Sequence, residues 1–318
     1  FYCAPVSSMN AGHNVVIVDI RPGTDAGSPA RVRIEPDLPS HIALETSAVT
    51  AAGNRRAVSA RLHREAGTME VTGILGLKRE NARLAVAVSD PARYAGLWFR
   101  RALVRYGIEC GGEIRVTYEP TDFTTHVRAA AHFSDPLAEI AKRILDESDN
   151  LGAECLARHL AIATAGEPAT GGSPAEETGA LAILRERGLP AGPPVRIDDG
   201  SGLSRTSLLA PSHLTWALIE ATKEDDFVFA GVVPLAEGHR KLGTHPMADE
   251  HRARIRAKTG SFQGTRCLAG YYTDADDAPL YAFAIMVNGL PADDDQAFAF
   301  EALVIDAVSK IAARHDRP

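Results

Sequence analysis

Apolar positions recur with a period of two, or form short β-branched runs, through the first part of the chain. Turn signals separate these segments: Arg21-Pro22-Gly23 closes the first, and Gly67-Thr68 joins two others as in a hairpin. The segments that fit this pattern are 13–20, 31–34, 57–63, 69–75 and 84–88. The pattern predicts a region built from β-strands.

From Pro91 the period changes to that of a helix. One apolar face runs over 94–104, and Ser134-Asp135-Pro136 is a start signal for a second stripe that ends at Ser148. Further helices are predicted over 151–163, from a capping box at 173–176 to Gly188, after Pro211, and over 296–313. The period returns to two in 255–258, 265–272 and 280–287, and the last two segments are predicted to form a hairpin.

This change of period predicts two units in a chain of 318 residues. Residues 1–84 are expected to form a β-rich accessory region that is incomplete. Residues 85–318 are expected to combine an antiparallel sheet with packed helices and a helical subdomain, so the fold class is α/β of the α+β kind.

Composition excludes several classes of function. With 45% hydrophobic and 24% charged residues the chain resembles an ordinary globular protein. Its net charge of −7 provides no general positive field for nucleic acid or for an anionic membrane surface. The longest apolar runs are far shorter than a membrane-spanning helix requires. The oligomeric state stays open.

Metal chemistry is not indicated either. The four cysteines (Cys3, Cys110, Cys155 and Cys267) have no metal-knuckle spacing, and the eleven histidines include no pair at ligand spacing with a third partner. Cys155 and Cys267 lie among apolar neighbours and are expected to be buried free thiols.

Two polar motifs in the second unit carry the candidate chemistry. Ser148-Asp149-Asn150 lies between two predicted helices, and Lys258-Thr259-Gly260-Ser261 follows 110 residues later at the end of a predicted strand. S-D-N and K-T-G, together with S-x-x-K, are the signature of penicillin-recognising serine enzymes. One such tripeptide alone occurs by chance in about 4% of chains of this length, so the ordered pair is the stronger signal.

The residue types suit a cleft that reads the anionic end of a peptide. A cationic Lys258 facing a hydroxyl and an amide fits a terminal carboxylate, and Thr259 and Ser261 add hydroxyl donors. Gly260 lets a substrate backbone approach the strand closely. No metal or organic cofactor is implied.

Simpler interpretations of the same residues remain open. Ser148-Asp149-Asn150 could be only a cap and turn, and Lys258 could be a solvated lysine at a strand end. Lys258 does not belong to a phosphate loop, because Ala257 rather than glycine precedes it. The acidic run 293–295 is expected to be a solvated loop.

Further segments in the same order extend the resemblance. They are Ala4-Pro5-Val6-Ser7-Ser8-Met9-Asn10, Ser89-Asp90-Pro91, Asp199-Gly200-Ser201-Gly202-Leu203-Ser204-Arg205 and Ala257-Lys258-Thr259-Gly260-Ser261. With them the chain resembles the D-alanyl-D-alanine carboxypeptidases/endopeptidases of the class C low-molecular-mass penicillin-binding proteins. The resemblance covers nearly the whole chain. It implies a penicillin-binding, β-lactamase-like transpeptidase fold, split by an accessory insertion that accounts for the β-rich start.

The resemblance also implies a reaction, partners and roles. The family hydrolyses the bond between terminal D-alanines of peptidoglycan stem peptides, outside the cytoplasm or in the periplasm, and β-lactams mimic this substrate. By resemblance, Ser148, Asn150 and Lys258 are catalytic, and Thr259, Gly260 and Ser261 bind the substrate carboxylate and backbone. The N–H of Phe262 is expected to complete an oxyanion hole, and Leu203 and Arg205 are expected near the peptide side chain.

One departure bears on activity. None of the six lysines has a serine three positions before it, so no S-x-x-K is present to supply a nucleophile and its base. The sequence begins at Phe1 without an initiator methionine or a leader, so we expect the nucleophile and the signal peptide to lie upstream, and we expect these 318 residues alone not to acylate. The alternatives are a non-catalytic cell-wall-binding pseudoenzyme and, less favoured, a class A β-lactamase; the residues around position 88 lack the S-x-x-K that the latter requires.

Overall fold

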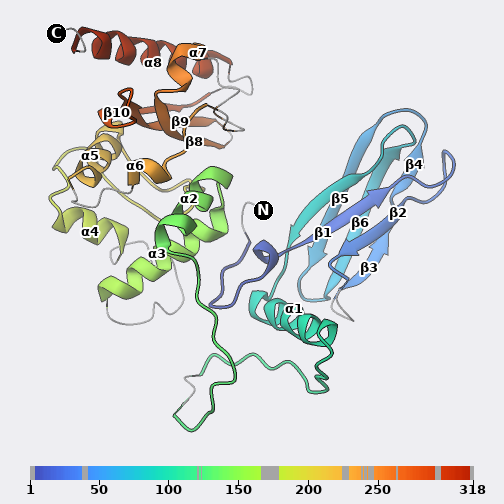
Figure 1. Cartoon of the computed structure of the whole chain (residues 1–318). Helices are drawn as coiled ribbons and strands as arrows, with labels where there is room; N and C mark the ends of the chain where they lie inside the picture. The colour runs from blue at the N-terminus through green and yellow to red at the C-terminus, as the bar shows by residue number, and fades with distance from the viewer. Residues whose placement is uncertain are drawn as a thin grey trace. The chain divides into compact units, whose positions relative to one another are not determined.

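The computed structural model describes residues 4–37, 42–119, 122, 124–165, 179–223, 229–237, 239, 242, 247–262, 264–290 and 295–315. The chain divides into two compact units, Phe1–Ala129 and Ala130–Pro318. Each unit has a hydrophobic core of its own (Figure 1).

Unit 1 contains two sheets. Its strands are β1 (Val15–Arg21), β2 (Arg31–Glu35), β3 (Ala43–Thr46), β4 (Val49–Ala51), β5 (Arg56–His63), β6 (Thr68–Gly76) and β7 (Ala82–Ala87). One sheet has the order β2-β1-β7 and is antiparallel throughout. In the other, β6 pairs in parallel with β3 and β4 and antiparallel with β5. The predicted β-rich region and the β5–β6 hairpin are therefore confirmed.

Alternation along the strands builds the core of unit 1. Val16, Val18 and Ile20 point inward from β1 and meet Met69 and Val71 of β6. A short 3-10 helix, η1 (Gly12–Asn14), precedes the strands. The helix α1 (Pro91–Arg105) follows them, and its N-cap Asp90 accepts a hydrogen bond from the Arg93 N–H at 2.9 Å. The buried Tyr94 of α1 donates its hydroxyl to the Val15 carbonyl oxygen at 2.8 Å, which fastens the helix to β1.

The division between units differs from the predicted boundary between residues 84 and 85. The strand β7 crosses that point and pairs with β1 from Ala82 to Ala87, so a division there would cut a sheet. The helix α1 also belongs to unit 1. The break after Ala129 leaves both in place.

Unit 2 combines helices with one antiparallel sheet. The helices are α2 (Leu137–Glu147), α3 (Asn150–Ala165), α4 (Ala180–Glu186), α5 (Pro211–Ala221), α6 (Phe229–Val232), α7 (Asp249–Arg252) and α8 (Asp295–His315). The strands β8 (Ile255–Phe262), β9 (Thr265–Thr273) and β10 (Pro279–Asn288) pair in the order β10-β9-β8. The predicted α+β fold class and the β9–β10 hairpin are confirmed.

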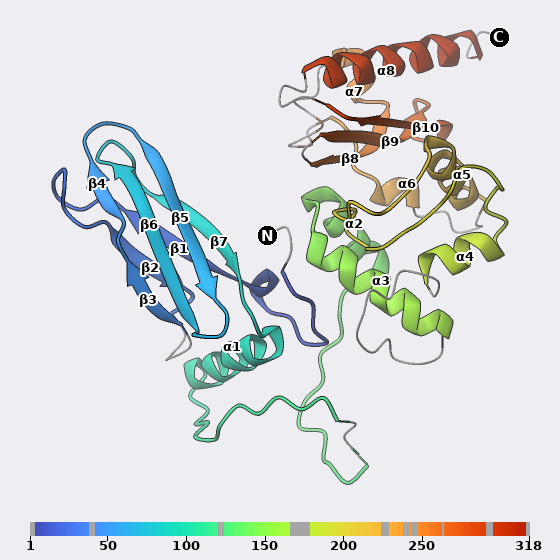
Figure 2. The same cartoon turned by 180° about the vertical axis from the view of Figure 1, so that it is seen from behind.

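The two faces of this sheet have different neighbours. Ile255, Ala257 and Leu268 share one face and pack with Ile305 and Ala312 of α8. The opposite face carries Lys258 and Tyr271, and the Tyr271 hydroxyl donates to the Leu218 carbonyl oxygen of α5 at 2.8 Å. Figure 2 shows α8 on one side of the sheet and α5, α6 and α2 on the other. Lys258 therefore lies on the sheet face that α5, α6 and α2 cover.

Some predicted details differ or fall outside the described residues. Pro136 rather than Ser134 or Asp135 is the N-cap of α2, and it makes no side-chain capping bond. The predicted capping box at 173–176, Cys3, and residues 293 and 294 lie outside the described residues. Among the helices that the structure describes, no stretch is both long enough and apolar enough to span a bilayer.

Candidate active site

Ser148 occupies the junction between two helices. It is the C-cap of α2 and adopts the left-handed conformation, with φ 55° and ψ 51°. Asp149 then caps the next helix, because its Oδ1 accepts the Leu151 N–H at 3.1 Å, and Asn150 is the first residue of α3. The tripeptide is thus a cap and turn, as the simpler interpretation held. The capping bond comes from Asp149, however, and the Ser148 hydroxyl is used elsewhere.

That hydroxyl meets the second motif. The Nζ of Lys258 donates to Ser148 Oγ at 2.5 Å and to the Thr259 carbonyl oxygen at 2.7 Å. Both side chains are half-buried, so solvent screens this charge-assisted contact less than it would on an open surface. A protonated amine held against a hydroxyl is an arrangement that can move a proton through that hydroxyl.

The edge of β8 beside this contact is open along part of its length. The Ala236 N–H donates to the Ile255 carbonyl oxygen and the Ala257 N–H donates to the Pro234 carbonyl oxygen, so residues 255 and 257 turn their backbone groups outward. Successive residues of a strand alternate in this respect, and β8 pairs with β9 without a register shift. The N–H groups of Thr259 and Ser261 therefore also face outward, and no described residue accepts from them.

This alternation corrects the expectation for Phe262. Phe262 pairs with Thr265 across a two-residue turn, so its N–H faces β9 and cannot reach a ligand at the outer edge. The outward donor at this end of the strand is the N–H of Ser261. If a backbone N–H of β8 stabilises an oxyanion, Ser261 supplies it.

Gly260 has no structural reason to be glycine within the described residues. A Cβ atom built there meets only the Cβ of Cys267, at an ordinary contact distance of 3.7 Å. Gly260 and Ser261 are exposed, and Thr259 is half-buried. Glycine at 260 therefore leaves room beside the strand that the fold itself does not need.

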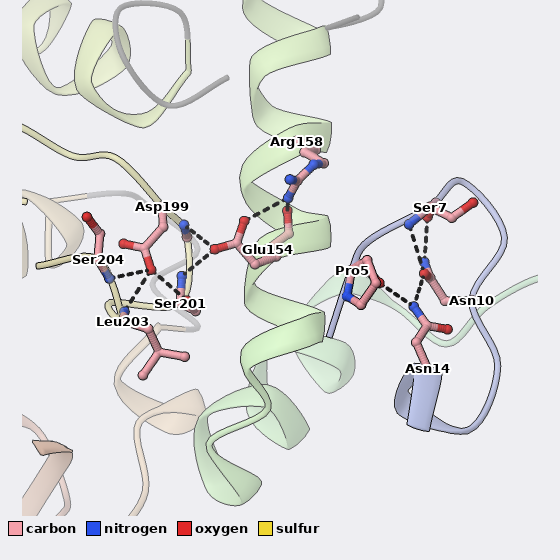
Figure 3. Close-up of polar contacts among 11 residues, drawn as sticks. Pro5, Ser7, Asn10, Asn14, Glu154, Arg158, Asp199, Ser201, Leu203 and Ser204 are labelled. Atoms are coloured by element: carbon pink, nitrogen blue, oxygen red, sulfur yellow. Dashed lines mark hydrogen bonds and ion pairs between the residues drawn. The ribbon is translucent and has the colours of Figure 1, made fainter. Parts of the chain in front are cut away.

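The loop 199–205 is organised by Asp199 and attached to α3 by Glu154 (Figure 3). The Oδ2 of Asp199 accepts from the Ser201 hydroxyl at 2.6 Å and from the N–H groups of Leu203 and Ser204 at 2.7 and 3.1 Å. The Oε1 of Glu154, on α3, accepts from the N–H groups of Gly200 and Ser201 at 3.0 and 3.2 Å. The loop that carries Leu203 and Arg205 is thereby attached to the helix that Asn150 begins.

Arg205 connects this loop to the strand. Its guanidinium carbon lies 5.7 Å from the centroid of the Phe262 ring, which is within the range of a cation–π contact. The Phe262 ring therefore contacts Arg205, whereas the Phe262 N–H faces β9. Leu203 is half-buried and Arg205 is exposed. Contacts therefore join β8 to two other segments that the sequence singled out: Lys258 to Ser148, and Phe262 to Arg205.

Two residues near these motifs were missed by sequence reasoning. One is Glu154, described above. The other is His239, whose Nε2 donates to the Asp146 carbonyl oxygen at 3.0 Å while its Nδ1 accepts the Leu242 N–H at 3.2 Å. His239 thus links the segment beside β8 to the last turn of α2. Neither residue has a motif around it; an acidic residue one helical turn after Asn150 was the only available signal for Glu154.

The first segment of the resemblance lies in unit 1 and forms its own polar cluster. The amide of the buried Asn14 donates to the Pro5 carbonyl oxygen at 2.9 Å and to Asn10 Oδ1 at 2.6 Å. Asn10 in turn exchanges hydrogen bonds with the backbone of Ser7. Figure 3 draws this cluster as well. These amides hold the turn that precedes β1.

Burial makes two of the thiols poor nucleophiles. Cys155 and Cys267 are not in disulfides and are half-buried, rather than fully buried as expected, and burial raises the pKa of both. Cys110 is free and exposed. No group of side chains in the described part of the chain is arranged to hold a metal ion.

Known proteins share this arrangement of elements. The structure of penicillin binding protein 4 (dacB) from Haemophilus influenzae superposes with a TM-score of 0.80 at 24% identity, over 96% of this chain and 68% of that one. A complex of the same protein with a β-lactam gives 0.78, over 96% and 72%. The fold is that of a penicillin-binding protein.

Proteins of similar sequence belong to the same group as these structures. D-alanyl-D-alanine carboxypeptidase DacB of Haemophilus influenzae is 31% identical over 235 residues, which are 71% of this chain and 46% of that protein. D-alanyl-D-alanine carboxypeptidase of Actinomadura sp. strain R39 is 28% identical over 311 residues, 91% of this chain and 54% of that protein. The chain spans about half the length of these relatives.

The model of the D-Ala-D-Ala carboxypeptidase 3 (S13) family matches residues 1–307, which is nearly all of the chain. This match sets aside the class A β-lactamase alternative. The protein is a member of the D-Ala-D-Ala carboxypeptidase 3 (S13) family.

Proposed function

We propose that unit 2 supplies part of the active site of a serine-type D-alanyl-D-alanine carboxypeptidase/endopeptidase, formed by the Ser148 junction, β8 and the loop 199–205. The substrates are peptidoglycan stem peptides, the reaction proceeds through an acyl-enzyme, and β-lactams occupy the same cleft. The observation that carries the proposal is the hydrogen bond between Lys258 and Ser148. Family membership supports the reaction class, and the proposal includes a location outside the cytoplasm.

The chemistry assigns one step to each polar group. Ser148 passes a proton to the leaving amine, and Lys258 keeps that hydroxyl oriented and attracts the substrate carboxylate. Asn150 positions the substrate amide. Thr259 and Ser261 bind the carboxylate through their hydroxyls, and the outward N–H of Ser261 stabilises the oxyanion. Leu203, Arg205 and the side chain of Phe262 contact the peptide side chain.

The nucleophile is not assigned within this chain. Residues 1–318 contain no S-x-x-K, so we propose that these residues by themselves form no covalent penicillin adduct. The β-rich unit 1 is proposed to be an accessory region. Neither unit is assigned a cofactor.

The test is covalent labelling of the full-length protein with a fluorescent penicillin. Lys258→Ala is expected to lower the labelling rate by about 100-fold or more, the scale of losing a charge-stabilising contact in a transition state. Lys310→Ala is the matched control, because Lys310 is exposed on α8 and pairs only with Asp306 among the contacts described. Near-normal labelling of Lys258→Ala would remove Lys258 from its role. Binding of peptidoglycan without any labelling of the unaltered protein would favour the pseudoenzyme alternative.

A further inference from the structure

Glu154 lies where the catalytic helix meets the loop 199–205. It follows Asn150 by four residues on α3, so both side chains lie on the same face of the helix. One carboxylate oxygen of Glu154 accepts from Arg158 at 2.7 Å, and the other accepts the two N–H groups of Gly200 and Ser201 (Figure 3). The side chain of Glu154 thus joins α3 to the loop 199–205.

The loop packs against α3 at the same place. A Cβ atom on Gly200 would lie 2.6 Å from both the Ala153 carbonyl oxygen and the Ala157 Cβ. The backbone of the loop therefore lies directly on the helix, and only glycine fits there. Asp199 organises the rest of the loop from within, so the loop is a preformed unit that Glu154 attaches as a whole.

The far end of this unit reaches the strand of the lysine motif. Arg205 stacks on Phe262, two residues after Gly260. Contacts therefore run from Asn150 along α3 to Glu154, through the loop to Arg205, and across to β8. Glu154 takes no part in the Lys258–Ser148 bond, so a change at Glu154 is expected to affect the loop end of this path.

We propose that Glu154 is a positioning residue that sets the selectivity of the cleft for the substrate side chain beside Arg205. Because Arg205 is a cation, the favoured side chains are anionic. The inference deepens the proposed function and rests on it. Glu154 touches no reacting atom; it acts by holding the N–H groups of Gly200 and Ser201, for which an uncharged amide oxygen suffices.

Amide hydrogen exchange tests the hold on the loop. Glu154→Ala is expected to raise the exchange rates of the Gly200 and Ser201 amides by about 10-fold or more, because both lose their acceptor. Glu154→Gln keeps an acceptor oxygen and should change these rates by less than about threefold. Arg158→Gln, which removes the ion pair but not the loop contacts, should resemble Glu154→Gln. Unchanged exchange in Glu154→Ala would overturn the proposal.

Selectivity is tested in the full-length protein with two penicillins that share a nucleus, one with a side-chain carboxylate and one without. The ratio of their labelling rates should fall about 10-fold in Glu154→Ala, mainly through slower labelling by the anionic compound, and Glu154→Gln should restore it. An equal loss for both compounds would mean a structural role only and contradict the proposal. Failure of the unaltered protein to react with either compound would instead refute the proposed function, and selectivity with it. Failure of the proposed function is therefore seen in the unaltered protein, whereas failure of the role of Glu154 is seen only in the Glu154→Ala variant.

Discussion

The Nζ of Lys258 lies 2.5 Å from the Oγ of Ser148, although 110 residues separate them in the chain. One comes from a helix–helix junction and the other from an edge strand, so no local sequence preference creates the contact. It exists because β8 presents Lys258 on the sheet face that the helical subdomain covers. The two motifs therefore lie in contact with each other in the folded chain.

Two glycines in neighbouring strands should differ in how much stability the protein loses when each is replaced by alanine. Gly260→Ala should change the free energy of unfolding by less than about 1 kcal/mol, because the new Cβ makes only an ordinary contact. It should nevertheless slow penicillin labelling of the full-length protein, since the methyl group projects beside the open edge of β8. Urea denaturation and labelling kinetics measure the two effects separately.

Gly270→Ala is the matched comparison. Its Cβ would lie 2.0 Å from the Arg256 carbonyl oxygen and 2.6 Å from the Ala257 Cα, so the strands must move apart. The expected loss is about 1–3 kcal/mol of unfolding free energy, the usual cost of overpacking. Equal stability losses for the two variants would show that Gly260 is also a packing requirement.

His239 should stabilise the last turn of α2. His239→Leu removes a donor to Asp146 and an acceptor for Leu242, and is expected to cost about 1–2 kcal/mol of unfolding free energy. Labelling should slow as well, because Ser148 follows Asp146 by two residues. His239→Gln, which keeps a donor and an acceptor, should recover part of both. Wild-type labelling in a destabilised His239→Leu variant would separate this histidine from the position of Ser148.

Tyr271 should make stability depend on pH in the alkaline range. Burial raises the pKa of its phenol from 10.0 to about 12 in the folded protein. The unfolded chain therefore ionises first, and the stabilisation, complete below pH 10, is lost as the pH rises from 10 to about 12. Burial raises the pKa of Tyr94 as well, so ultraviolet titration should show two late-ionising tyrosines, and Tyr271→Phe should remove one of them. A phenol at 271 that ionises with the exposed tyrosines would contradict this account.

Sequence pattern predicted the strands and helices that depend on local period. The residues of β1 form a β-branched run, those of β5 and β6 alternate, α2 has an apolar stripe, and α5 begins at the start signal Pro211. The unit boundary was misplaced because β7 pairs with β1, whose residues lie far upstream. Periodicity identifies a strand but not its partner, so it could not predict that β7 pairs with the distant β1.

Within the site, the sequence predicted the motif residues but not the residues that hold them in place. Ser148 and Lys258 belong to short patterns with known chemistry, whereas Glu154 reaches Gly200 across 46 residues and His239 reaches Asp146 across 93. The orientation of Phe262 could have been inferred. Gly264 signals a two-residue turn, and the residues that flank such a turn face each other across the hairpin.

The left-handed backbone of Ser148 has a consequence for directed evolution. At φ 55° a glycine would relieve about 1 kcal/mol of conformational cost that serine bears. A library screened only for heat resistance should therefore enrich glycine at this position, and the selected variants should be thermally stable but inactive. Selection for thermal stability would favour glycine at position 148, whereas selection for turnover would favour serine.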